Sequence, residues 1–68
     1  MLIEAATINF QDVESSDEAA AIVRYDASRV SLCLSLKLNG DVEVVMNIND
    51  AKRLIEALQK ATSLGGKG

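Results

Sequence analysis

Few side chains in this sequence can carry out acid–base or nucleophilic chemistry. The chain has no histidine and one cysteine, so it lacks an imidazole general base, a Cys/His pair and a Cys/His zinc cluster. We interpret Cys33 as a small apolar residue rather than a nucleophile, because free cysteines are commonly buried. The sequence therefore predicts no catalytic residue, no metal site and no cofactor.

Carboxylates are the remaining candidates for catalysis. Those between Asp12 and Glu18 fall in a polar segment that indicates a solvated loop, where burial would not adjust a pKa for catalysis; a recognition loop for a basic partner is the alternative. Asp41 and Glu43 share one face of a predicted strand and are typical of a hairpin surface. Residues 65–68, GGKG, follow a predicted helix instead of preceding one, so they do not form a phosphate loop. We expect no enzymatic activity.

Charge is distributed unevenly along the chain. Residues 1–28 hold six acids and one arginine, whereas residues 29–68 hold six basic residues and four acids, which gives a net charge of −3 overall. This balance, with Phe10 and Tyr25 as the only aromatic residues, argues against general nucleic-acid binding. A small anionic ligand remains a candidate. Its predicted site, duplicated between subunits of an oligomer, consists of Arg24, Lys52 and Arg53, the last two near a helix N-terminus.

The clearest structural pattern surrounds Asn39-Gly40. Apolar and small polar residues alternate with period two before and after this dipeptide, which predicts the two strands of a hairpin. A two-residue turn would split the apolar residues between the two faces. We therefore expect a three-residue loop, Leu38-Asn39-Gly40, with Gly40 at positive φ as a G1 bulge, or a loop starting one residue later. The first choice pairs Leu36 with Val42, Leu34 with Val44, Leu32 with Met46 and Val30 with Ile48.

A helix is predicted from Asn49 to Thr62. Asn49 or Asp50 can accept hydrogen bonds from the first free backbone amides. Gly65 and Gly66 should end the helix, because glycine readily adopts the left-handed conformation found there. The apolar stripe must cover a sheet face. It consists of Ala51, Leu54, Ile55, Leu58, Ala61 and Thr62, and Leu54, Ile55 and Leu58 should hold the helix to the sheet.

Two further strands precede the hairpin. Alternation between Ala6 and Phe10 predicts the first. The segment 19–25, AAAIVRY, has an alanine-rich start compatible with a helix, but its β-branched and aromatic residues favour an extended strand. A tight turn at Ala27-Ser28 would give one consistent register. In it Tyr25 pairs with Val30, Val23 with Leu32 and Ala21 with Leu34, and Asp26 faces Arg29 as an ion pair.

These elements predict an α+β fold, a four-stranded antiparallel β-meander followed by one C-terminal α-helix packed on one sheet face. Residues 1–64 should form a single domain and residues 65–68 a flexible Gly-rich tail. A chain of 68 residues buries only about 60% of its unfolded surface, so a monomer would be marginally stable and association is expected.

The sheet face away from the helix is the predicted interface of a homo-oligomer. Ile22, Cys33 and Val45 should lie near its centre, which makes this face more apolar than one designed only for water. Burial of a strand edge is the other way to assemble. Scattered surface apolar residues, which are normal in folded proteins, are the alternative explanation.

Two classes of function remain open. The first is a non-enzymatic, homo-oligomeric protein-interaction module that acts on a partner as an inhibitor or adaptor. The second is a protein that binds or sequesters a small anionic nucleotide between subunits. Small acidic chains are frequent among phage-encoded inhibitors of host systems, which is an association of size and charge only.

The sequence also suggests a cellular compartment. The N-terminal residues lack a basic segment followed by a long apolar one, so we expect neither a signal peptide nor a membrane span. One cysteine cannot pair within the chain, which favours a reducing, cytoplasmic environment.

Overall fold

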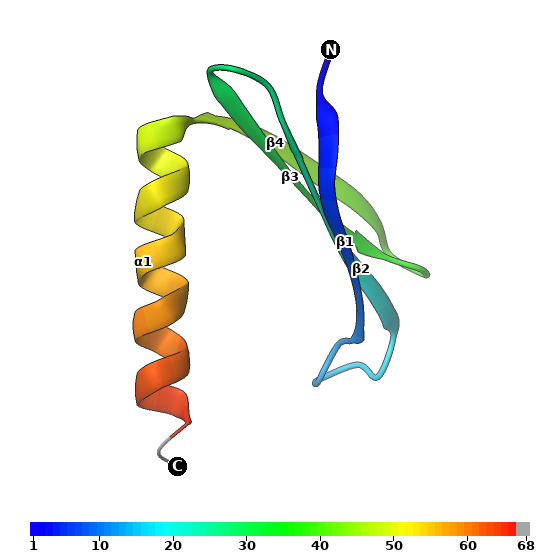
Figure 1. Ribbon diagram of the computed structural model, residues 1–68. Helices are drawn as coiled ribbons and strands as arrows, with labels where there is room; N and C mark the ends of the chain where they lie inside the picture. The colour runs from blue at the N-terminus through cyan, green and yellow to red at the C-terminus, as the bar shows by residue number, and fades with distance from the viewer. Residues whose placement is uncertain (67–68) are drawn as a thin grey trace.

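The computed structural model describes residues 1–66 and contains one sheet and one helix (Figure 1). The four strands are hydrogen-bonded in chain order, each antiparallel to the next. The predicted α+β meander with a C-terminal helix is confirmed. The elements are β1 (Ile3–Gln11), β2 (Glu18–Tyr25), β3 (Arg29–Leu36), β4 (Gly40–Asn47) and α1 (Ile48–Gly65).

The register of the β2–β3 hairpin is the one predicted. Tyr25 pairs with Val30, and the same alternation continues to the far end of both strands. At the turn, the Asp26 carboxylate accepts hydrogen bonds from the backbone amides of Ser28 and Arg29 and from the Arg29 guanidinium. The predicted ion pair is therefore part of the turn, and it closes the hairpin together with the Asp26 amide, which donates to the Arg29 carbonyl.

The predicted register of the β3–β4 hairpin is wrong by two residues. Leu36 lies opposite Gly40, so the loop is Lys37-Leu38-Asn39, one residue earlier than expected. Gly40 has the predicted positive φ, 86°, and the Asn39 amide donates to the Leu36 carbonyl. A shift by two residues keeps every side chain on the same face, so period two cannot detect it. The observed pairs are Leu34 with Val42, Leu32 with Val44 and Val30 with Met46.

The first strand is longer than its alternating segment suggested. It begins at Ile3 and pairs along its whole length with β2, with an irregularity between Glu4 and Ala6. The extra residue at this bulge, Ala5, lines the space between the sheet and α1. A bulge of this kind bends an edge strand and increases its twist.

The helix begins at Ile48, one residue before the predicted start. Asn47, the last residue of β4, is the N-cap, and its side-chain oxygen accepts a hydrogen bond from the Asp50 amide at 2.8 Å. Asn49 and Asp50, the predicted caps, lie inside the first turn, and Ile48 is helical rather than paired with Val30.

The C-terminal end of α1 also differs from the prediction. Gly65 belongs to the helix, and the C-cap Gly66 has φ −67°, a right-handed conformation instead of the left-handed one. Two residues of the predicted tail, Lys67 and Gly68, lie outside the described residues. Over residues 1–66, no helix combines the length and the apolar character needed to cross a bilayer.

The helix packs on the sheet only near its first turns. Its Cα atoms approach β3 and β4 but, in residues 1–66, not β1 or β2. Ala51 is buried and Leu54 is half-buried, whereas Ile55 is 54% exposed and Leu58 57% exposed. The predicted burial of Ile55 and Leu58 is wrong for a single chain, because α1 and the sheet diverge after the junction (Figure 1).

Gly40 should be the position in the β3–β4 turn that is most sensitive to substitution. An added Cβ meets nothing within 4 Å, so the penalty comes from the φ of 86° alone. Gly40→Val should lower the free energy of unfolding by roughly 1–2 kcal/mol. Asn39→Ala should cost clearly less in the same urea titration. Gly65→Ala is the control, because that glycine is helical and should tolerate alanine; equal losses at positions 39 and 40 would contradict the assignment.

Stability should depend on pH through Asp26. Hydrogen bonds from Arg29 are the main reason that the pKa of Asp26 falls from 3.8 to about 2. A lowered folded pKa stabilises the protein above the unfolded value and stops doing so as the pH falls through the folded value. The urea midpoint of Asp26→Asn should therefore lie below that of the wild type above pH 3.8, and the gap should close towards pH 2. Glu14→Gln, an exposed carboxylate in the β1–β2 loop, is the control; a gap that persists unchanged at the lowest pH would refute this role.

Candidate functional site

The most unusual feature of the fold is an apolar sheet face that its own helix leaves open. Paired residues of an antiparallel sheet share a face, so the side of the sheet that meets α1 is apolar from β1 to β4. The large side chains on this side that remain roughly half exposed define what we name the open apolar face. They are Ile3, Ile8, Phe10, Tyr25, Leu34, Val42 and Val44 on the sheet, with Ile55 and Leu58 on α1.

A groove of about 380 Å³ lies where α1 and the sheet diverge. The helix contributes one wall through its apolar stripe, and β1 to β4 contribute the floor. Every side chain that lines the groove is apolar apart from the phenol hydroxyl of Tyr25. The lining residues are Ala5, Val23, Tyr25, Val30, Leu32, Met46, Ala51, Leu54, Ile55 and Leu58.

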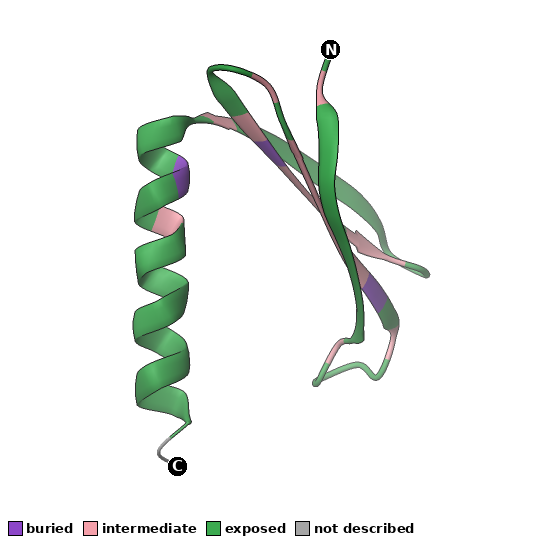
Figure 2. Ribbon diagram, in the orientation of Figure 1, coloured by how far each residue is buried: buried purple, intermediate pink, exposed green. Residues whose placement is uncertain are grey.

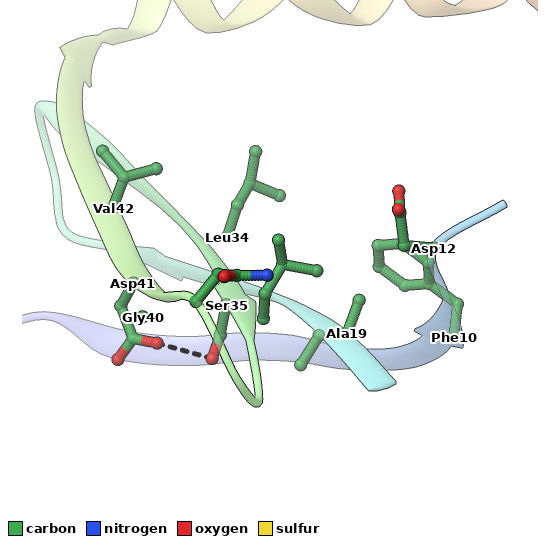
Figure 3. A pocket seen from close by; sticks show the side chains of 11 residues that line it. Phe10, Asp12, Ala19, Leu34, Ser35, Gly40, Asp41 and Val42 are labelled. Carbon is green, nitrogen blue, oxygen red and sulfur yellow. Dashed lines mark hydrogen bonds between the residues drawn. The ribbon is translucent and has the colours of Figure 1, made fainter. Parts of the chain in front are cut away.

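A second hollow of about 390 Å³ lies at the other end of the sheet, beside the β3–β4 turn. Phe10, Leu34 and Val42 line it and extend the same apolar side beyond the reach of α1. In Figure 3, Leu34 and Val42 point to one side of the sheet and Ser35 and Asp41 to the other. The Ser35 hydroxyl donates to Asp41 at 2.6 Å. The two sheet faces therefore differ sharply in polarity.

Burial is correspondingly sparse (Figure 2). Across residues 1–66, the only buried apolar residues are Ala19 and Ala51. The accessible surface is 5381 Å², whereas a compact monomer of this size exposes roughly 4,200 Å². The excess of about 1,200 Å² is surface that folding of a single chain normally hides.

The opposite sheet face is built around a polar cluster. Ser31 is completely buried and donates to Glu43 Oε2 at 2.6 Å. Arg24 Nη1 lies 3.3 Å from the same oxygen. The Glu43 carboxylate thus has both a hydroxyl and a guanidinium as partners, so the polar groups at the centre of this face are paired with one another.

The predicted interface residues lie beside this cluster. Ile22 pairs with Cys33, and Cys33 pairs in turn with Glu43. Val45 pairs with Ser31. The structure therefore brings Ile22 and Cys33 together and places Val45 in the adjacent row, with polar groups between. Their role as an interface stays a prediction.

The predicted ligand residues are not brought together within one chain. Arg24 lies on the sheet face away from α1 and pairs with Glu43. Lys52 and Arg53 lie on α1, both exposed, and Arg53 Nη1 lies 3.5 Å from Asp50 Oδ1. An anion site made from all three would need two subunits, as the sequence analysis assumed. That site also stays a prediction.

The acidic β1–β2 loop forms its own network of hydrogen bonds. Asp12 Oδ2 accepts from the Ser15 hydroxyl and the Ser15 amide, and these bonds lower the pKa of Asp12. Ser16 has a positive φ of 65°. In the described part of the chain, no group of three or more acidic or cysteine side chains is arranged to hold a metal ion. Asp12 thus accepts hydrogen bonds from within the loop, whereas Asp17 Oδ2 accepts one from the Asn39 side chain in the β3–β4 turn.

Sequence reasoning missed the open apolar face. It assigned the helix-side face to the core and expected the exposed apolar surface on the other side. Comparing the width of the helix with the width of the sheet would have predicted this face. One helix about 10 Å across covers only about two strands spaced roughly 4.8 Å apart.

Comparison with protein-family models, with curated proteins and with solved structures finds no match for this chain.

The Arg24–Glu43 pair should contribute measurably to stability. The two side chains are 37% and 44% exposed, so a double-mutant cycle with alanine at both positions should give a coupling of about 0.5–1 kcal/mol, reduced at high salt. The Asp50–Arg53 pair, 53% and 83% exposed, is the matched control and should couple less. Equal coupling in both cycles would show that the cluster does not fix Arg24.

Proposed function

We propose that this chain is a non-enzymatic protein-interaction module that works as a homo-oligomer and acts on a further partner as an inhibitor or adaptor. The open apolar face is the observation that supports this proposal. Contiguous apolar surface of this extent on a small chain is typical of a protein–protein interface. This face carries half-exposed side chains on three strands and the helix: Ile8 on β1, Leu34 on β3, Val42 and Val44 on β4, and Ile55 and Leu58 on α1.

The amount of excess surface fits this proposal. If each of two copies hid about 1,200 Å², the interface would total about 2,400 Å², in the range of obligate homodimers rather than transient contacts. Obligate interfaces are also the more apolar class, resembling a domain core cut in half. The nearly uniform apolar lining of the groove has this character.

The face opposite α1 is left for a second partner. It carries charged and hydroxyl groups in fixed positions, with Glu43 and Arg24 near its centre. Polar surface with ordered partners suits a reversible contact at the rim of an interface better than a permanent one. A nucleotide-sequestering role has less support, because Arg24 and Arg53 already have carboxylate partners.

Assembly should fail when a charge is placed in the open apolar face. Leu58→Asp buries an unpaired carboxylate in the proposed interface and should weaken association on the order of 100-fold or more. Gln59→Asp adds the same charge to the same helix on its polar side and should leave association unchanged. Sedimentation equilibrium of both variants and the wild type, at tens of micromolar in the same buffer, measures the effect.

A third variant separates the two sheet faces. Val45→Asp charges the opposite face, where Val45 is 48% exposed. Dissociation by Val45→Asp but not by Leu58→Asp would move the interface to the face predicted from sequence. A wild type that sediments as a monomer throughout this range would overturn the proposal.

A further inference from the structure

We propose that the open half of the sheet, over β1 and β2, is covered by α1 of a second copy, with the two copies exchanging this contact reciprocally. This inference rests on the homo-oligomer proposed above and specifies how the copies meet. The positions on the sheet that the partner helix would cover lie at Ile8, Phe10 and Ala21.

The sheet is wider than one helix can cover. Four strands spaced roughly 4.8 Å apart need two helices of about 10 Å diameter to cover one face. The chain has one helix, and it approaches β3 and β4 but not β1 or β2 within residues 1–66. The vacant width therefore corresponds to one more helix, and a second copy offers one with a matching apolar stripe.

The surface of the uncovered half of the sheet is uneven, with small side chains on β2 between larger ones on β1 and β3. On β2 the side that meets α1 begins with Ala19 and Ala21, which are small, whereas the neighbouring strands carry Phe10 and Ile8 on one side and Leu34 on the other. The small residues form a trough between two ridges. A helix ridge made of Leu58 and the residues one turn away fits a trough of this kind.

The apolar stripe of α1 extends beyond the part of the helix that contacts the sheet. Beyond Leu54, the stripe continues through Ile55, Leu58, Ala61 and Thr62, all of them exposed in the single chain. At about 100° per residue the stripe spans roughly 120° of the helix circumference. Its first residues, Ala51 and Leu54, meet the sheet of the same chain, and the exposed remainder is available to the sheet of a second copy.

The helix and the β1–β2 hairpin carry net charges of opposite sign. β1, β2 and their loop hold five acids and one arginine, a net charge of −4, whereas α1 holds three basic residues and two acids. Reciprocal exchange places the net positive helix of one copy over the acidic hairpin of the other. The polar side of the helix, with Lys52, Arg53 and Lys60, stays at the rim.

Site-directed cross-linking tests this arrangement. In a Cys33→Ser background, one chain carries Ala21→Cys on β2 and a second, isotope-labelled chain carries Ala61→Cys on α1. The two are mixed after brief denaturation and refolding, treated with a short bismaleimide and analysed by mass. The cross-linked product of one labelled and one unlabelled chain should form at least tenfold faster than in a control experiment. In the control, Gln59→Cys, on the polar side of α1, replaces Ala61→Cys. Thr62→Cys repeats the test with a second helix position and should give the same excess.

The outcomes separate this inference from the function on which it rests. A wild type that sediments as an oligomer, with no excess of the mixed product over the Gln59→Cys control at either helix position, overturns reciprocal helix exchange and leaves the homo-oligomer standing. A wild type that sediments as a monomer, with no mixed product, overturns both. An oligomer with the tenfold excess supports both, and circular dichroism of each variant shows that the comparison is between folded chains.

Discussion

The mismatch between one helix and a four-stranded apolar face is the constraint on which the rest of the structure depends. α1 contacts β3 and β4, so apolar side chains of β1 and β2, such as Ile8 and Phe10, stay roughly half exposed. Exposed apolar surface costs about 25 cal/mol per Å² relative to burial. Covering this face with apolar surface would remove this unfavourable contribution to the free energy of the isolated chain.

The two faces of the sheet differ in whether their side chains have partners within the chain. On the face away from α1, cross-strand polar contacts satisfy one another, as Ser31 with Glu43 and Ser35 with Asp41 do. A buried hydroxyl without such a partner would cost about 1–3 kcal/mol. On the helix side, the paired residues of neighbouring strands are apolar and offer no hydrogen bonds between side chains. The polar groups of one face therefore have partners within the chain, whereas large apolar side chains of the other face remain exposed.

The sequence was sufficient for topology and insufficient for packing. Period-two alternation predicted the strands, and the turn at Asp26 gave the β2–β3 register correctly. The same alternation could not distinguish Leu36 opposite Val42 from Leu36 opposite Gly40, because both keep the faces intact. The N-cap is Asn47 rather than the predicted Asn49 or Asp50, because the strand runs directly into the helix. Burial of Leu58 was overestimated because periodicity shows which side of a helix is apolar but not how far that side lies from the sheet.

The junction between β4 and α1 explains why the helix cannot close the gap by itself. β4 ends at Asn47 and α1 begins at Ile48, with no linker residue between them. Because Asn47 is both the end of an edge strand and the helix cap, the helix must start at that edge and its direction is fixed there. Moving the start of the helix from the edge strand to the centre of the sheet would shift it by about one and a half strand spacings, roughly 7 Å, which at about 3.3 Å per extended residue requires about two more residues. The direct connection between β4 and α1 thus leaves the half of the sheet formed by β1 and β2 uncovered by the helix.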